Sequence, residues 1–318
     1  MNFYKLRFKS SLHLGERETF LEGTDIIIHS DTLFSAFCHC YLLLYGEEKL
    51  NFLIENFKEN KPPFLISSTF PWRDDKIYFP VPLNQIPREK ETKKIQFIEK
   101  DGFEKLLEGE RIEEIRKKFK TVPDLNTEEE KIPYQIVNTP RVSLSRLTNH
   151  PGEEFFHFGE VFYKENSGLF FLVDFKDQTI ITEFNATLRL MADEGIVGDR
   201  TVGKGLFEIN EIKDINFNLP SDSNGFLTLS LYSPKEDEVS DIKNGYYEII
   251  ERRGYIFSPY RKNLRRKSIR MLKEGSVFLS YKVGRLVDVT PEAFTEHKIY
   301  RYGLAFMLPC KLEIKDED

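Results

Sequence analysis

Four glycines and two cationic side chains lie within eleven residues of this chain, in the segment 195–205, which reads Gly-Ile-Val-Gly-Asp-Arg-Thr-Val-Gly-Lys-Gly. Glycine accepts backbone angles that other residues avoid, and the missing Cβ lets a ligand approach the backbone closely. Backbone N–H groups beside Arg200 and Lys204 suit an anion, above all a phosphate. The segment therefore predicts a phosphate-binding loop; the alternative is a long structural turn.

The spacing Gly-x-x-x-x-Gly-Lys inside this glycine loop resembles the start of a P-loop, but Gly205 stands where a Ser or Thr must bind Mg²⁺. A P-loop also leads from a strand into a helix. Here the periodicity predicts a helix over 185–194 before the loop and an alternating strand over 206–212 after it. A dinucleotide-binding turn needs a third glycine and a following helix. ATP and NAD are therefore poor candidates, and a nucleic-acid backbone is the favoured ligand.

A general acid or base for RNA cleavage is most often a histidine. Among the six histidines, His29 stands before Ser30 and Asp31 at a predicted helix start, where Ser30 suits the N-cap and Asp31 the positive end of the helix. We favour a structural or RNA-contacting role for His29. The competing hypothesis is a metal-independent endoribonuclease that processes a precursor RNA with His29 as general acid or base.

No metal site or cofactor is expected. Cys38 and Cys40 are two positions apart on the predicted helix, so they do not face each other, and no second ligand pair accompanies them. Three cysteines fit a reducing compartment better than a disulfide scaffold. The apolar run 26–45 contains charged or polar residues such as Asp31 and cannot span a bilayer without a large cost. We expect a cytoplasmic protein without a membrane partner.

Charge is segregated along the chain, whose formal net charge is −6. The basic run 252–273 contains nine Lys or Arg and no Asp or Glu. A local concentration of positive charge is typical of a nucleic-acid-binding surface. We therefore expect the basic run to line the same RNA-binding groove as Arg200 and Lys204. The alternative is that the run contacts an acidic protein surface. The run contributes five predicted contact residues: Arg261, Lys262, Arg265, Arg266 and Lys267.

The order of predicted elements indicates an α+β fold with two ferredoxin-like (split βαβ, RRM-like) domains. Residues 1–224 form the first, with a charged helical insertion at about 84–133 in which a helix is predicted over 103–118. Residues 225–318 form the second, with a helix predicted over 239–252. A turn signal at 165–168 predicts a hairpin between 155–163 and 169–175.

Five segments together resemble one family, in the same order and over nearly the whole chain. They are His29–Ala36, Tyr78–Pro82, Arg141–Arg146, Gly195–Gly205 and Met271–Ser276. The family is the repeat-associated (RAMP) subunit that caps the 5′ end of the crRNA in type III-A CRISPR effectors, the Csm complex.

The resemblance implies a noncatalytic subunit that binds the repeat-derived 5′ tag of the crRNA. It also implies a β-hairpin thumb, here 141–156, and docking on the large polymerase-like subunit and on a RAMP backbone subunit. With the residues argued from charge, the predicted RNA-binding set is His29, Ser30, Arg141, Arg146, Gly198, Arg200, Thr201, Val202, Gly203, Lys204, Gly205, Arg261, Lys262, Arg265, Arg266 and Lys267.

Overall fold

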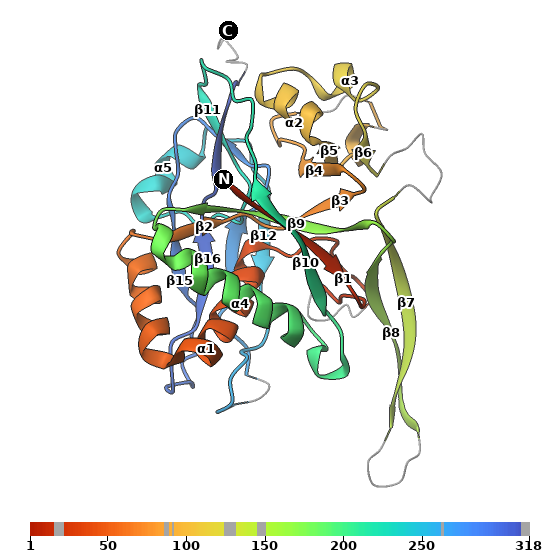
Figure 1. Cartoon of the computed structure of the whole chain (residues 1–318), viewed down its shortest axis with the longest axis vertical. Helices are drawn as coiled ribbons and strands as arrows, with labels where there is room; N and C mark the ends of the chain where they lie inside the picture. Colours follow the sequence, from red (N-terminus) through yellow and green to blue (C-terminus); the bar gives the residue numbers. More distant parts are fainter. Residues whose placement is uncertain are drawn as a thin grey trace.

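The computed structural model of the chain describes residues 1–15, 22–85, 89–90, 92–123, 132–144, 151–261 and 264–312. It is an α+β structure built on antiparallel sheets. Figure 1 shows α1 and α4 on one side of the central sheet and a long hairpin projecting from the rest of the molecule. Within the described part of the chain, no helix has the length and apolar character needed to cross a membrane.

The central sheet runs β10-β1-β9-β3-β4-β5-β6, with β2 also paired to β9. β1 is an inner strand because β9 and β10 pair with its two edges, and its apolar side chains Tyr4 and Leu6 are buried. In chain order, the strands are β1 (Asn2–Phe8), β2 (Phe64–Ile66), β3 (Phe70–Arg73), β4 (Lys76–Pro80), β5 (Phe97–Glu99), β6 (Thr121–Val122), β9 (Ser167–Phe175) and β10 (Phe207–Asp214).

Two helices cover one face of this sheet: α1 (Ser30–Lys58) and α4 (Ile181–Glu194). The predicted helix start at Ser30 is confirmed. The helix continues to Lys58 beyond a kink at Gly46, whose φ is +81°. The predicted helix over 185–194 and the strand after the glycine loop are also confirmed. The apolar face of α1 buries Phe34 and Phe37 against the core, as the helical spacing predicts.

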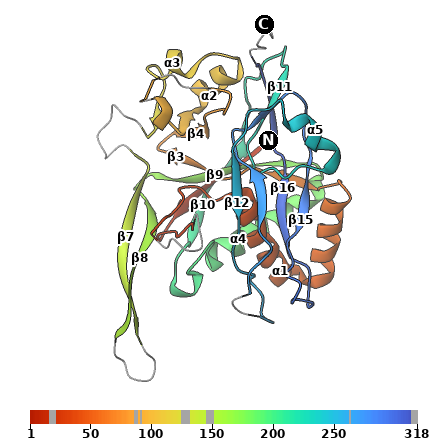
Figure 2. The same cartoon turned by 180° about the vertical axis from the view of Figure 1, so that it is seen from behind.

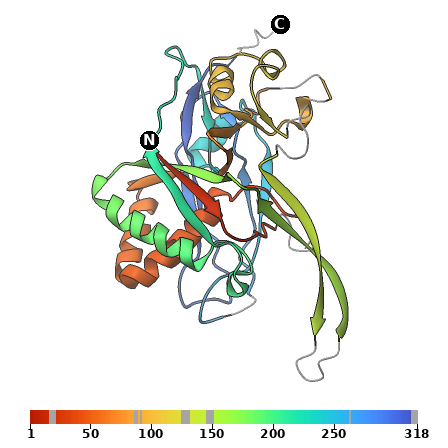
Figure 3. The ribbon, with the colours of Figure 1, turned by 45° about the vertical axis from the view of Figure 1, so that its right-hand side comes forward.

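The projecting hairpin consists of β7 (Tyr134–Leu144) and β8 (Pro151–Tyr163) and is seen from a second side in Figure 3. It includes the described part of the predicted thumb. The predicted pairing of 155–163 with 169–175 is wrong, because β8 pairs with β7. β9 is instead a buried inner strand whose edges are taken by β1, β2 and β3.

The insertion at 84–133 extends the sheet and adds short helices to it. The single helix predicted over 103–118 is wrong: Gly109, with a φ of +97°, separates two helices. Apolar residues of both helices are buried in the main core, which is why this charged segment packs on the body. The elements are η1 (Thr92–Lys94), α2 (Lys100–Leu107) and α3 (Ile112–Ile115), with β5 and β6.

The C-terminal half forms small antiparallel sheets on the side opposite α4, as Figure 2 shows from behind. The helix predicted over 239–252 is wrong beyond Ile242. The chain turns at Gly245, and 249–252 alternates in exposure as a strand paired with β13. The elements are β11 (Gly225–Thr228), η5 (Glu236–Glu238), α5 (Val239–Ile242), β12 (Ile249–Arg252), β13 (Ile269–Leu272), β14 (Val277–Phe278), β15 (Gly284–Asp288), β16 (Tyr300–Leu304) and β17 (Met307–Cys310).

The two halves share one buried apolar cluster. Leu227, Tyr302 and Leu304 of the C-terminal half belong to the same cluster as the residues of the central sheet. The ring centroids of Phe34 in α1 and Tyr302 in β16 are 5.0 Å apart. Helix α1 is therefore packed between the two halves and positions its N-terminal residues at their junction.

Candidate nucleic-acid interface

The glycine loop connects α4 to β10 and closes on itself at its base. The amide of Ile196 donates to the carbonyl of Gly205 over 3.0 Å. Gly195 and Gly205 both have positive φ, +78° and +74°, and a Cβ on Gly205 would lie 2.0 Å from the Ile196 carbonyl oxygen. These two glycines are therefore required by the fold of the loop itself.

The outer part of the loop is an exposed single turn, η4 (Arg200–Val202). Asp199 and Gly203 flank it, both in the left-handed region with φ values of 60° and 81°. Val202 is 67% exposed, and a Cβ on Gly203 would meet no atom within 4 Å. Gly198 likewise has room for a side chain and no positive φ. The amides of Val202, Gly203 and Lys204 donate within the turn, to the carbonyls of Asp199 and Arg200. A phosphate contact at this turn therefore depends on its cationic side chains more than on backbone N–H groups.

Lys204 binds a carboxylate of the projecting hairpin. Its Nζ lies 2.8 Å from Oε1 of Glu160 in β8 and donates to Oγ of Ser11 over 2.7 Å. Ser11 and Thr139 also donate to Glu160, each over 2.8 Å. Burial opposes ionisation of Glu160, but the hydrogen bonds from Lys204, Ser11 and Thr139 prevail and hold the pKa of Glu160 below its ordinary value. Lys204 thus fixes the loop against the hairpin, a role that its place in a glycine-rich segment does not reveal.

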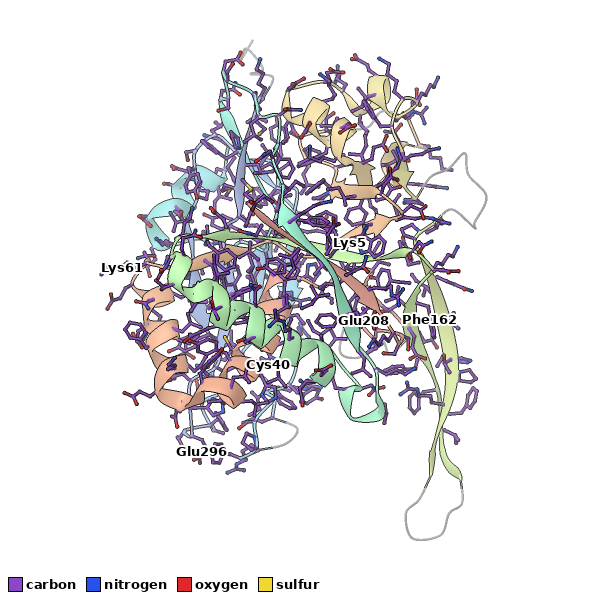
Figure 4. All side chains as sticks on the ribbon, viewed as in Figure 1. Lys5, Cys40, Lys61, Phe162, Glu208 and Glu296 are labelled. Carbon is purple, nitrogen blue, oxygen red and sulfur yellow. The ribbon has the colours of Figure 1, made fainter. Side chains whose placement is uncertain are left out.

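A second ion pair joins the same two elements. Nη1 of Arg141 in β7 donates to Oδ2 of Asp199 over 2.7 Å. The guanidinium carbon of Arg141 also lies 3.8 Å from the ring centroid of Phe158, and the ring of His13 is 4.0 Å from the same centroid. The hairpin base and the glycine loop are therefore one electrostatically cross-linked unit. Figure 4 shows Phe162 on β8 in this region, and its ring centroid is 5.9 Å from Nζ of Lys204.

Arg200 is the cation of the loop that points to the C-terminal half. Its guanidinium carbon lies 4.4 Å above the ring centroid of Phe257, and the edge of His39 contacts the same ring at 4.8 Å. Within the described part of the chain, no carboxylate forms an ion pair with Arg200, in contrast to Arg141 and Lys204. The Arg200–Phe257 contact connects the glycine loop to the basic run. The sequence predicted only that these two segments line the same groove.

His29 and Ser30 are not placed to contact a ligand in this structure. His29 is 6% exposed, with Nε2 3.0 Å from Asp25 Oδ2 and Nδ1 2.8 Å from Glu274 Oε1. Burial and Arg252 lower the pKa of His29, but Glu274 and Asp25 prevail and raise it to about 9. Ser30 is buried, and its Oγ accepts from the amide of Leu231 over 3.0 Å. Both residues stabilise the junction of the two halves, and we remove them from the candidate interface.

Asp31 binds two arginines that sequence reasoning did not connect with it. It accepts from Nε and Nη2 of Arg252 over 3.0 and 2.9 Å and from Arg301. Burial opposes its ionisation, but Arg252 and Arg301 prevail and hold the pKa of Asp31 far below its ordinary range. The helix-start role predicted for Asp31 is thus only part of its function. Arg252, the first residue of the basic run, is engaged inside the protein.

The rest of the basic run divides into exposed and engaged residues. Arg261, Arg265 and Lys267 are exposed, and Arg265 lies 5.6 Å from the ring centroid of Tyr255. Arg266 is half-buried and donates through Nε to the Tyr255 carbonyl over 2.8 Å. Burial and the neighbouring Arg301 lower the pKa of Arg266 to about 10. Arg146, Lys262 and the side chain of Thr201 lie outside the described residues.

Cys38 and Cys40 do not form a metal site in this arrangement. Burial raises the pKa of both thiols, and Figure 4 places Cys40 within the α1 region of the core. Among the residues that the structure describes, no group of three or more His, Cys, Asp or Glu side chains could hold a metal ion.

Both parts of the chain match known families. The RAMP superfamily matches residues 5–208, and the CRISPR Csm4 C-terminal domain matches residues 221–310. The protein named CRISPR system Cms protein Csm4 from Methanocaldococcus jannaschii is 26% identical, with 96% of each chain covered. The protein of the same name from Thermococcus onnurineus is 27% identical, covering 90% of this chain and 92% of its own.

Solved structures share the fold over the whole length. A chain in the crystal structure of the Csm3-Csm4 subcomplex of the type III-A CRISPR-Cas interference complex superposes with a TM-score of 0.66 at 23% identity, covering 98% of this chain and all of that one. A chain in the crystal structure of the Csm1-Csm4 cassette with pppApA gives a TM-score of 0.62 at 22% identity, with 99% of each chain covered.

Proposed function

Because the chain belongs to the RAMP superfamily, we propose that it is a noncatalytic RNA-binding subunit of a type III-A CRISPR interference complex. In this role it holds the repeat-derived 5′ tag of the crRNA and anchors the large polymerase-like subunit and a RAMP backbone subunit. The Csm4 relatives and the Csm4 C-terminal domain match support the assignment, and the solved Csm3-Csm4 and Csm1-Csm4 assemblies support the two protein partners.

The observation that carries the proposal is the convergence of three elements at Arg200. The exposed turn of the glycine loop presents this guanidinium, the hairpin is ion-paired to the same loop through Arg141, and the basic run reaches it through Phe257. Single-stranded RNA is bound through its phosphates and through its unstacked bases. A cation on an exposed turn, without a carboxylate partner among the described residues, supplies the phosphate contact.

The proposal includes two ferredoxin-like domains, residues 1–224 and 225–318. The first is supported by the sheet order β10-β1-β9-β3, in which α1 follows β1 and α4 follows β9. The second is supported by the separate family match over 221–310 and by the antiparallel strands of that half, although α5 has only four residues.

The noncatalytic part of the proposal is supported by the environment of His29. At neutral pH a pKa of about 9 makes His29 an imidazolium, and both of its nitrogens are engaged by Asp25 and Glu274. A general base needs a free nitrogen within reach of the substrate. The buried position therefore disfavours the endoribonuclease hypothesis.

Purification of the tagged protein from its native cell, followed by sequencing of the bound RNA, tests the proposed function. We expect guide RNAs that begin with the repeat-derived tag, together with a large subunit and a RAMP backbone subunit. Cells carrying His29→Gln should contain guide RNAs of unchanged length. Recovery of no enriched RNA contradicts the binding role, and accumulation of precursor RNA in the His29→Gln cells contradicts the noncatalytic role.

A further inference from the structure

We propose that Phe257 and Tyr260 each provide a stacking surface for an unpaired base of the RNA, beside the phosphate contact of Arg200. The inference rests on the proposed function and adds to it a second kind of contact, made with bases. It concerns the exposed aromatic residues that lie between Arg253 and Arg261 in the basic run.

Three aromatic side chains of this run are exposed: Tyr255 by 46%, Phe257 by 63% and Tyr260 by 65%. Exposed apolar side chains that occur together, and not singly, mark interaction sites. These three rings lie within one six-residue segment, 255–260. Phe257 is held in place by Arg200 at 4.4 Å and by the edge of His39 at 4.8 Å. Phe257 nevertheless remains exposed, and we expect a base to stack on the ring surface that these contacts leave uncovered.

Tyr260 is positioned by a different set of contacts. The ring of His297 lies 6.2 Å from its centroid, and Nε2 of His297 is 3.1 Å from Oγ of Ser258 in the same segment. The two contacts connect the segment around Tyr260 to the loop that carries His297. Tyr260 is thus supported from one side and exposed on the rest of its surface.

The charges around these rings favour RNA over a protein as the occupant. The run 252–273 carries nine basic and no acidic residues, and Arg261 next to Tyr260 is exposed. Protein-docking surfaces also enrich aromatic residues and Arg, but Lys is depleted there, whereas this run contains Lys267 and Lys273 as well. Aromatic rings interleaved with cations are instead typical of single-stranded nucleic-acid binding, in which bases stack on the rings and phosphates contact the cations.

A fluorescence experiment reads the stacking directly. The sole tryptophan, Trp72, is buried in β3, so the Phe257→Trp variant gains an exposed reporter that wild-type protein lacks. The probes are oligoadenylate and an abasic ribose-phosphate oligomer of the same length. We expect oligoadenylate to quench the fluorescence of the Phe257→Trp protein and the abasic oligomer to leave it unchanged. Equal responses to both probes overturn the proposal.

Affinity measurements complete the test. Phe257→Leu and Tyr260→Leu should each raise the Kd for oligoadenylate on the order of 10-fold, with little effect on the abasic oligomer. Phe257→Trp and Tyr260→Phe should retain wild-type affinity. Tyr281→Leu is the matched control, because Tyr281 is an exposed tyrosine outside the basic run.

The outcomes separate this inference from the function on which it rests. If wild-type protein binds RNA but the Leu variants bind it equally well, stacking is wrong and phosphate binding stands. If the Leu variants keep their RNA affinity and lose a copurifying subunit, the rings belong to a protein interface and the proposal is overturned. If wild-type protein binds neither probe, both the inference and the RNA-binding function are contradicted.

Discussion

Nζ of Lys204 and Oε1 of Glu160 are 2.8 Å apart, and Glu160 is only 3% exposed. The pair joins the glycine loop to the projecting hairpin, 44 positions earlier in the chain. One of the two cations that predicted a phosphate site is therefore already neutralised inside the protein. Arg200 is left as the cation of the loop without a carboxylate partner among the described residues.

Removing Lys204 should reduce stability more than it reduces RNA contact. Lys204→Met removes the nearer cation of the buried Glu160 and leaves the more distant Arg141, whose Nη2 lies 3.7 Å away, beside the hydroxyls of Ser11 and Thr139. We expect the free energy of unfolding to fall by about 1–3 kcal/mol. Adding Glu160→Gln should recover part of the loss, because the unpaired charge is gone. Urea unfolding of both variants measures this, and an unchanged Lys204→Met midpoint contradicts it.

Asp31 should be among the most sensitive positions of the chain. Asp31→Asn leaves Arg252 and Arg301 without their shared carboxylate at the junction of the two halves. We expect a loss of about 3–5 kcal/mol in unfolding free energy. The control is Asp174→Asn, whose ion pair with Lys176 is exposed and should contribute less than about 1 kcal/mol. Equal denaturation midpoints for the two variants contradict the prediction.

His29 should make the stability depend on pH in the alkaline range. Its pKa is about 9 in the folded protein and about 6.5 when unfolded, so its stabilisation is complete below pH ~6.5 and is lost as the pH rises through about 9. The total contribution to the free energy of unfolding is on the order of 3 kcal/mol. It is stabilising because Glu274 and Asp25, which raise the pKa of His29, outweigh burial and Arg252, which lower it. Urea unfolding should show wild type losing its advantage over His29→Gln between about pH 6.5 and 9.5. A constant difference across this range contradicts the assignment.

The glycines of the loop should differ in what they tolerate. Gly205→Ala places a methyl group against the Ile196 carbonyl and should destabilise the protein by about 3 kcal/mol or more. Gly203→Asn has open space and a left-handed φ that asparagine tolerates, so its cost should be about 1 kcal/mol or less. If RNA lies against this turn, Gly203→Asn should still weaken RNA binding. Thermal unfolding and RNA affinity measured together separate the two effects, and equal stability of both variants contradicts the first.

Local patterns predicted the elements that depend on neighbouring residues. Helical spacing identified α1 and α4, and the glycine-rich segment marked a loop in which Gly195, Gly203 and Gly205 have positive φ. The partner of β8 was missed, because a turn signal does not say whether the chain folds back or continues into an inner strand. The helix over 239–252 was wrongly extended beyond Ile242, because the charged and apolar residues of this segment fit either a helical or a strand period.

The segments that form the site were predicted, but the ion pairs between their side chains were not. The sequence located the glycine loop and the basic run, but Glu160 and Asp199 gave no sign that they neutralise Lys204 and Arg141. Such ion pairs are set by tertiary contacts across long sequence separations. Phe257 is an aromatic residue inside a run of cations, a pattern typical of nucleic-acid contacts, but it was not among the predicted RNA-binding residues. His29 was misplaced because a helix start does not reveal its burial.

The central claim is that Arg200 contacts the RNA backbone. The most direct test is the affinity of purified protein for single-stranded RNA over a range of salt concentrations, for wild type, Arg200→Ala and Arg189→Ala. Arg189 is an exposed arginine of α4 and controls for the loss of one charge. We predict that Arg200→Ala binds on the order of 10-fold more weakly with a salt slope reduced by about one, while Arg189→Ala binds like wild type. Wild-type affinity and an unchanged salt slope for Arg200→Ala contradict the account.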